Sequence, residues 1–178
     1  MNIIIFGGSF NPIHYGHIGL GRWVLEHTET DEIWFMVSPN NPLKDASILA
    51  DEAERFRGVK CAVEENNMSM PNGKVLRASD FEFYLPRPSY TANTLRELQK
   101  AYPEHRFSLL IGEDNWEIFS RWREYEFILA NFPIYVYPRH SKRVNEAFGP
   151  LPYGSVTYLK DAPYYDISST EIREKQKK

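Results

Sequence analysis

Short apolar runs alternate along the chain with longer stretches of helical periodicity, and this alternation limits the fold more than any other feature. The runs Asn2–Phe6, Glu32–Val37 and Arg106–Ile111 are rich in β-branched and aromatic residues, as buried strands are. Helices are predicted between such runs, over His17–Glu29 and Thr91–Tyr102. Because strands that alternate with helices favour right-handed βαβ units, we expect an α/β fold with a Rossmann-like open parallel sheet and helices on both faces.

The rest of the chain continues this pattern. The further predictions are a polar loop over Asn40–Asp45, helices over Leu49–Glu65 and Ser168–Lys177, strands over Val75–Phe83, Pro133–Tyr137 and Ser155–Leu159, and one or two short helices within Trp116–Asn131. The 178 residues contain no internal repeat and no low-complexity linker. We therefore expect residues 1–178 to form a single domain.

Composition excludes several classes of partner. The formal net charge is −3, whereas a nucleic-acid-binding domain usually has a basic face, so we expect no nucleic acid. No stretch approaches the roughly 20 apolar residues that span a bilayer, so we expect no membrane association. Cys61 is the only cysteine, which rules out an internal disulfide and favours a reducing, cytoplasmic location. The sequence leaves open whether the chain forms a homo-oligomer.

The loop after the first predicted strand has the parts of an anion site. It reads Gly7-Gly8-Ser9-Phe10-Asn11-Pro12-Ile13-His14-Tyr15-Gly16-His17, which fits neither the dinucleotide-binding glycine pattern nor a P-loop. Two glycines let backbone N–H groups approach an anion, and the helix that follows offers its positive end. His14 and His17 are three residues apart and share a face there. The alternatives are a plain turn with half-buried histidines, or a pair of metal ligands.

A second string with affinity for anions lies in the last predicted helix. Asp166-Ile167-Ser168-Ser169-Thr170-Glu171-Ile172-Arg173 contains Ser168-x-x-Glu171, a capping box that would by itself explain these residue types. The hydroxyl-rich helix start also offers donors to an anion. Side chains tilt toward the start of a helix, so the fork of Arg173 would reach the same anion.

Both strings resemble motifs of one family. The first is similar to the His-x-Gly-His motif of the nucleotidylyltransferase superfamily, in the form found in nicotinate-nucleotide adenylyltransferases, and the second matches the Ile-Ser-Ser-Thr-x-Ile-Arg motif of those enzymes. The resemblance implies transfer of AMP from ATP to nicotinate mononucleotide, which yields nicotinate adenine dinucleotide and pyrophosphate in NAD biosynthesis. It implies that His14, His17 and Arg173 are catalytic and stabilise charge on the phosphates. Mg²⁺ would arrive with the ATP phosphates, without a dedicated protein site.

The resemblance also implies the binding residues on each side of the reaction. Those for ATP are Gly7, Gly8, Ser9, Phe10, His14, His17, Gly112, Asp114, Ile167, Ser168, Ser169, Thr170 and Arg173. Those for the nicotinate nucleotide are Asn40, Lys44, Thr91 and Trp116. The chain departs from the family pattern at Glu113, where alanine is usual, and at Leu43, where histidine is common. Read without the resemblance, Gly112 is a turn, Thr91 a helix cap, Trp116 a core residue and Lys44 a solvated lysine.

Two other functions stay open at this stage. The same reaction on nicotinamide mononucleotide or phosphopantetheine would keep the ATP side and change the acceptor. A module that binds nucleotides without turnover would need neither histidine. The first-strand loop and the Ser89-Tyr90-Thr91 string, which resemble the nicotinate family, disfavour phosphopantetheine. They separate nicotinate from nicotinamide mononucleotide less well, because only one carboxylate distinguishes those two acceptors.

Overall fold

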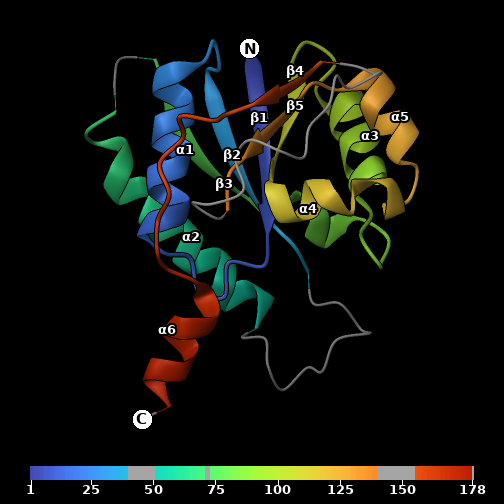
Figure 1. The fold of residues 1–178 in the computed structure, drawn as a ribbon. Helices are drawn as coiled ribbons and strands as arrows, with labels where there is room; N and C mark the ends of the chain where they lie inside the picture. The colour runs from blue at the N-terminus through green and yellow to red at the C-terminus, as the bar shows by residue number, and fades with distance from the viewer. Residues whose placement is uncertain (40–50, 71–72, 140–154, 178) are drawn as a thin grey trace.

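The computed structural model describes residues 1–39, 51–70, 73–139 and 155–177. These residues form one six-stranded sheet, with helices against both faces (Figure 1). The strands are β1 (Asn2–Gly8), β2 (Glu32–Val37), β3 (Val75–Ser79), β4 (Arg106–Gly112), β5 (Ile134–Tyr137) and β6 (Val156–Tyr158). The helices are α1 (Tyr15–His27), α2 (Glu52–Asn67), α3 (Thr91–Ala101), α4 (Glu113–Glu117), α5 (Tyr125–Asn131) and α6 (Ser169–Gln176), with 3₁₀ turns at Phe81–Tyr84 and Phe119–Arg121.

All five strand pairs are parallel, and the strand order is β3-β2-β1-β4-β5-β6. The chain builds outward from β1 to β3, then returns to the other side of β1 and builds outward again from β4. This reversal between β1 and β4 is a topological switch point, where open α/β sheets bind ligands beyond the carboxyl ends of their strands. The predicted α/β fold with an open parallel sheet is confirmed.

The two faces of the sheet are buried by different helices. Along β1, Ile4 and Phe6 point into a core formed with α1 and α2, whereas Ile3 and Ile5 point into a core formed with α3 and α5. This alternation follows from the two-residue period of a strand. Figure 1 shows α1 and α2 on one side of the sheet and α3, α4 and α5 on the other.

Two predicted strands end elsewhere than expected. The first continues through the glycine pair, because Gly7 and Gly8 still pair with Met36 and Val37 of β2. The third was predicted over Val75–Phe83 but stops at Ser79, and a 3₁₀ turn follows. The β2 register reaches only one residue beyond its last pair with β3, so little strand remains to continue the ladder.

The last helix lies beyond the carboxyl end of the sheet. Figure 1 shows α6 extending away from the strands, and none of its residues is buried. Its amino end is therefore held by the loops at that edge and not by a hydrophobic face. Within the described part of the chain, no helix combines the length and the apolar character needed to cross a membrane.

Candidate active site

A buried arginine of α2 holds the loop between β1 and α1 in place. Arg55 of α2 is 3% exposed and donates to the backbone carbonyl oxygens of Ser9, at 2.6 Å, and Ser38, at 2.8 Å. Hydrogen bonds from a charged donor are stronger than neutral ones. Because a peptide's C=O and N–H point in opposite directions, a Ser9 carbonyl directed at Arg55 leaves the N–H of Phe10 facing away from that guanidinium.

Phe10 connects this loop to the imidazole of His17. Its φ of 45° places the backbone in the left-handed region, which costs a non-glycine residue about 1 kcal/mol or more. Its ring is buried among Phe6, Phe35 and His17, with a centroid 5.0 Å from the His17 ring in an edge-to-face arrangement. Burial of this ring offsets the backbone strain and limits the orientations open to the imidazole.

His14 and His17 form a stacked pair at the start of α1. Their ring centroids are 3.7 Å apart and their planes differ by 23°. Imidazole lone pairs lie in the ring planes, so nearly parallel rings do not converge on a metal at about 2.0 Å. The backbone N–H of His14 donates to Nδ1 of His17 at 3.3 Å. Since Nδ1 accepts, a neutral His17 carries its proton on Nε2, which becomes a donor.

Both imidazoles are neutral near pH 7 in this structure. Burial lowers the pKa of His17 to about 3, and the repulsion that a protonated His17 would meet from Arg139 and from His14, when that imidazole is also protonated, adds to the shift. Burial and Arg139 also lower the pKa of His14, and the negative charge of Glu171 offsets part of that shift. Nδ1 of His14 is buried without a hydrogen-bond partner. The pair therefore offers donors and acceptors whose needs are unmet until an anion or another polar group arrives.

The start of α6 is held directly against the β1–α1 loop. Ser169 Oγ donates to the carbonyl of Pro12 at 2.8 Å, and the Arg173 guanidinium donates to the carbonyl of Asn11. Arg173 also donates to Thr170 Oγ1 at 3.1 Å. The two strings singled out in the sequence, more than 150 residues apart, thus bring their helix amino ends to one place.

The capping interpretation of the second string is confirmed at Ser168. Its Oγ accepts from the backbone N–H of Glu171 at 3.2 Å, while the Glu171 carboxylate accepts from the Ser168 backbone N–H at 2.9 Å. The Ser169 hydroxyl is likewise committed to Pro12. The hydroxyls of Ser168 and Ser169 therefore hold the helix start in position. The Thr170 hydroxyl, which accepts from Arg173, the backbone N–H groups and the rest of the Arg173 fork are the donors that face the cavity.

Two cavities meet at the imidazole pair. The tyrosine cavity, about 270 Å³, is bounded by Tyr137 and by the Pro163–Ser168 segment. The strand-end cavity, about 470 Å³, is bounded by residues that follow β1, β2 and β4 and by the start of α6. The residues that line both are Phe6, His14, His17, Tyr137, Arg139 and Ser168. Together they approach the size range of small-molecule sites, with two compartments and a shared polar centre.

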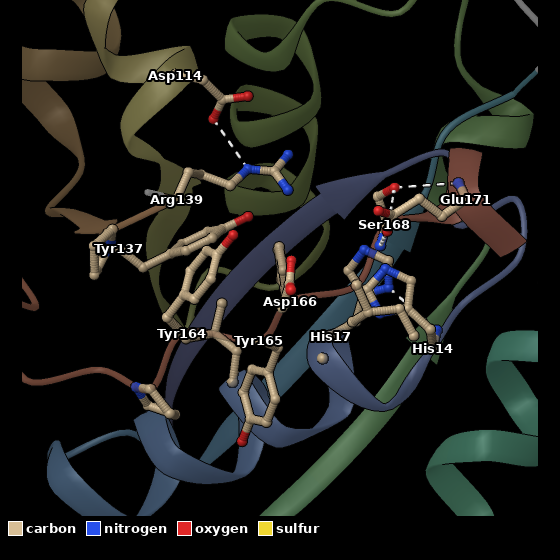
Figure 2. Close-up of a pocket in the computed structure, with 16 residues that line it drawn as sticks. His14, His17, Asp114, Tyr137, Arg139, Tyr164, Tyr165, Asp166, Ser168 and Glu171 are labelled. Carbon is tan, nitrogen blue, oxygen red and sulfur yellow. Dashed lines mark hydrogen bonds and ion pairs between the residues drawn. The ribbon is translucent and has the colours of Figure 1, made fainter. Parts of the chain in front are cut away.

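The tyrosine cavity depends on a close approach between α1 and the segment before α6. A Cβ on Gly16 would lie 3.0 Å from both Ile167 Cγ2 and Tyr165 Cβ. A Cβ on Gly19 would collide with the Tyr165 hydroxyl. Figure 2 shows Tyr164, Tyr165 and Asp166 crossing in front of α1, with the imidazoles beside them. Gly16, the glycine of the His-x-Gly-His motif, therefore lets the segment before α6 pack close enough to α1 to form the wall of this cavity.

The far end of the strand-end cavity is formed by α3 and by a tryptophan that the sequence interpretation did not select. Thr91 lines the cavity at the start of α3, as Trp122 does, whereas Trp116 is not among its lining residues. Trp116 stacks on Phe119 at 5.2 Å, within the core on the α3 side. Trp122 therefore lies where the sequence placed an aromatic side chain for the acceptor, and the role of Trp116 stays a prediction. The two differ by six positions in an irregular segment, so periodicity does not distinguish them.

A buried carboxyl group also lines this end. Glu82 accepts from Thr94 Oγ1 at 2.7 Å and is 9% exposed. Burial raises the pKa of Glu82, and the Thr94 hydrogen bond offsets part of that shift. The hydrogen bond therefore ties the 3₁₀ turn at Phe81–Tyr84 to α3 in the wall of the cavity.

Gly112 and Asp114 lie at the carboxyl end of β4, beside Arg139. Arg139 Nε donates to Asp114 Oδ1 at 3.2 Å, and Figure 2 shows the guanidinium extending from the end of β5 toward the cavity. The sequence interpretation did not select Arg139, although this residue lies just beyond the predicted strand Pro133–Tyr137. Ligands of open α/β sheets bind beyond the carboxyl ends of the strands, and this position is one of them. The predicted residues Asn40 and Lys44 lie outside the described residues.

Comparison with known proteins identifies the family. Residues 5–175 match the family described as cytidylyltransferase-like. A relative in Bacteroides thetaiotaomicron, named "Probable nicotinate-nucleotide adenylyltransferase", is 47% identical over 96% of this chain and 79% of its own length. A Flavobacterium johnsoniae relative with the same name is 43% identical over 97% of the chain and 85% of its own length.

Solved structures share the fold. Nicotinic acid mononucleotide adenylyltransferase of Plasmodium falciparum complexed with NaAD superposes with a TM-score of 0.72 at 22% identity, over 97% of this chain and 82% of the other. The same Plasmodium enzyme complexed with APC gives a TM-score of 0.70 at 22% identity, with the same coverage.

Proposed function

Because the chain belongs to the cytidylyltransferase-like family, and within it to the nicotinate-nucleotide adenylyltransferases, we propose the reaction that its site performs. The enzyme transfers AMP from ATP to nicotinate mononucleotide and releases pyrophosphate. The products are nicotinate adenine dinucleotide, an intermediate of NAD biosynthesis, and pyrophosphate. The observation that carries this proposal is the junction of two cavities at a stacked histidine pair, flanked by the amino ends of α1 and α6.

The two cavities suit the two nucleotides. Adenosine occupies the tyrosine cavity, where aromatic rings of Tyr137 and Tyr164 provide flat apolar surface and Asp114 lies within reach of ribose hydroxyls. The acceptor occupies the strand-end cavity with its pyridine ring toward Trp122 and Thr91. Their phosphates then meet at the imidazole pair, which is the arrangement that an in-line transfer requires.

No side chain has to remove a proton for this reaction. The acceptor phosphate has a second pKa of about 6 and is largely a dianion near neutral pH, so its oxygen is already a nucleophile. It attacks the α-phosphorus of ATP, a new P–O bond forms, and the bond between the α- and β-phosphates breaks. The protein contributes position and charge stabilisation.

His17 is placed to stabilise the α-phosphate. Its Nδ1 is occupied by the His14 backbone N–H, so the donor is Nε2. A donor directed at an oxygen that gains charge in the transition state contributes roughly 3–4 kcal/mol. His14, also neutral, shares this position, and Arg173 with the α6 N–H groups receives the leaving pyrophosphate. Gly7, Gly8 and Ser9 line the strand-end cavity, where the end of β1 brings the backbone close to the phosphates.

Mg²⁺ fits this site as an ion that arrives with ATP. The described residues contain no cluster of three or more His, Cys, Asp or Glu side chains that would hold a metal by themselves. Its ligands would therefore come mainly from phosphate oxygens and water, as is common for Mg²⁺. When bound, it supplies charge neutralisation between the phosphates.

The acceptor end supports a carboxylate better than an amide. The start of α3 directs backbone N–H groups and the positive end of the helix dipole toward the cavity near Thr91. Nicotinate mononucleotide is therefore favoured over nicotinamide mononucleotide. Phosphopantetheine is the other alternative acceptor for this reaction. Its flexible arm has no aromatic ring to stack on Trp122, so we expect it to bind less tightly than nicotinate mononucleotide.

Pyrophosphate release with each acceptor in turn tests this function. We expect release with ATP and nicotinate mononucleotide, with kcat/KM at least tenfold above that for nicotinamide mononucleotide or phosphopantetheine. His17→Ala should lower kcat by two or more powers of ten, since it removes about 3–4 kcal/mol of transition-state stabilisation. Absence of release with every acceptor would instead support a module that binds nucleotides without turnover.

A further inference from the structure

Arg139 places a formal positive charge where the two cavities join. Its side chain is 43% exposed, and it lines both cavities just beyond the end of β5. Among the described residues that line either cavity, the basic side chains are His14, His17, Arg139 and Arg173. The lowered pKa values leave both histidines neutral near pH 7, so the two arginines carry the positive charge that faces the phosphates.

Three consecutive residues after β4 shape the place that Arg139 occupies. Asp114 Oδ1 accepts from its Nε at 3.2 Å, and Glu113 Oε2 accepts from its backbone N–H at 3.3 Å. Glu113 is only 3% exposed, so this carboxylate is a fixed part of the interior. A Cβ on Gly112 would lie 2.5 Å from Asp114 Oδ1 and 3.0 Å from Arg139 Nε. The residues Gly112 to Asp114 therefore fit the arginine closely.

The arginine keeps its phosphate-binding groups available. The hydrogen bond to Asp114 uses Nε, and the guanidinium lies over the Tyr137 ring with Cζ 5.8 Å from the ring centroid. Within the described part of the chain, no hydrogen bond or ion pair engages the two terminal nitrogens. These nitrogens form a planar fork that matches two oxygens of a phosphate. In Figure 2 the fork lies between Asp114 and the side of the cavity that holds the imidazoles.

We propose that Arg139 is a substrate-binding residue whose terminal nitrogens bind ATP phosphate oxygens while Asp114 holds its Nε. The second carboxylate oxygen of Asp114 stays available to a ribose hydroxyl, so the pair links ribose binding to phosphate binding. The identity of the ligand rests on the proposed function, whereas the anion-binding role of Arg139 rests on the geometry above.

The effect of Arg139 on the histidines gives an independent readout. Its positive charge is one of the causes that lower the pKa of both His14 and His17. Replacement of Arg139 by an uncharged residue should therefore raise both imidazole pKa values in the unliganded protein. A residue that only supported the fold from a distance would not change these titrations.

Arg139→Met tests the proposal, with Arg96→Met as the matched control. Arg96 also forms an ion pair, at 2.9 Å with Glu124, and its guanidinium also lies over an aromatic ring, but it lines neither cavity. We expect Arg139→Met to raise the Kd of Mg-ATP about tenfold to one-hundredfold, the loss typical of hydrogen bonds to a charged group. The Kd of adenosine should change less than twofold, and Arg96→Met should leave both values within twofold.

Calorimetry with ATP and adenosine, and NMR titration of the histidine ring protons, measure these effects. An ATP Kd within twofold of the wild-type value would overturn the proposal, as would equal weakening of ATP and adenosine. If Arg139→Met does not fold by circular dichroism, Arg139→Lys replaces it. Lysine keeps the charge without the fork, so we expect ATP to bind about three- to tenfold more weakly, and wild-type affinity would contradict the fork.

The same measurements separate this proposal from the proposed function. If the wild-type protein binds ATP but releases no pyrophosphate with any acceptor, the adenylyltransferase assignment fails. The comparison of ATP with adenosine in Arg139→Met would still decide the role of Arg139.

Discussion

Gly16→Ala should damage ATP binding without unfolding the protein. The added methyl group would meet Ile167 Cγ2 and Tyr165 Cβ at 3.0 Å and His14 Cε1 at 3.1 Å. Such contacts are tighter than ordinary van der Waals contact, so each neighbour must retreat by a few tenths of an ångström. Tyr165 Cβ is next to the backbone, which forces the segment before α6 to move as a whole.

The effects of Gly16→Ala on stability and on activity can be estimated separately. Overpacking costs about 1–3 kcal/mol, and alanine in a helix recovers up to about 1 kcal/mol relative to glycine. The free energy of unfolding should therefore fall by about 0–3 kcal/mol. A displacement near 1 Å at a reacting centre can cost about one-hundredfold in rate, so a displacement of a few tenths of an ångström should cost less. Ile167 immediately precedes the Ser168 cap of α6, so we expect kcat/KM for ATP to fall about threefold to thirtyfold.

Steady-state kinetics and urea unfolding measure the two effects on one protein. Gly58→Ala is the control: Gly58 is exposed in α2, and a Cβ there would meet no atom within 4 Å. This variant should gain about 0.5–1 kcal/mol in unfolding free energy and keep wild-type kinetics. The reasoning is refuted if Gly16→Ala keeps kcat/KM for ATP within twofold of the wild-type value.

Three further predictions concern the supports of the site. The pKa of His17 is about 3 when folded and near 6.5 when unfolded. Its unfolded form therefore binds more protons between these values, and the free energy of unfolding falls as pH drops through this window. From pH 7.5 to 5, urea unfolding should show a wild-type loss about 2 kcal/mol greater than that of His17→Gln; equal losses would contradict the lowered pKa. Trp122→Ala should raise the KM for the acceptor about five- to one-hundredfold, because it removes the stacking energy of one aromatic ring. Trp116→Ala should leave this KM within twofold of the wild-type value. A larger effect of Trp116→Ala than of Trp122→Ala would show that Trp116 is the ring that binds the acceptor. Arg55→Met removes the donors to the carbonyls of Ser9 and Ser38, so it should lower the unfolding free energy by about 2–4 kcal/mol and raise the KM for ATP. The control Arg57→Met, on the exposed side of α2, should change neither value. An unaffected KM in Arg55→Met would show that the β1–α1 loop keeps its shape without Arg55.

The sequence by itself determined the fold class and the two strings that the structure brings together. Strand and helix periods are local properties, so the run at Asn2–Phe6 and the Leu95–Leu98 face of α3 indicate their own elements. The cap at Ser168 is local as well, since its partner Glu171 lies three residues away. Strand ends were less certain, because pairing across the sheet decides them: Gly7 and Gly8 remain in β1 through β2.

Only the tertiary structure decided which distant side chains meet. Trp122 and not Trp116 lines the cavity, although both rings pack on Phe119, at 5.1 and 5.2 Å. Arg139, at the end of β5, contacts Asp114, which is 25 positions away along the chain. Arg55 of α2 contacts Ser9 of the β1–α1 loop, which is 46 positions away. Side-chain direction and burial depend on neighbours supplied by other elements, and a single sequence does not specify those neighbours until the sheet assembles.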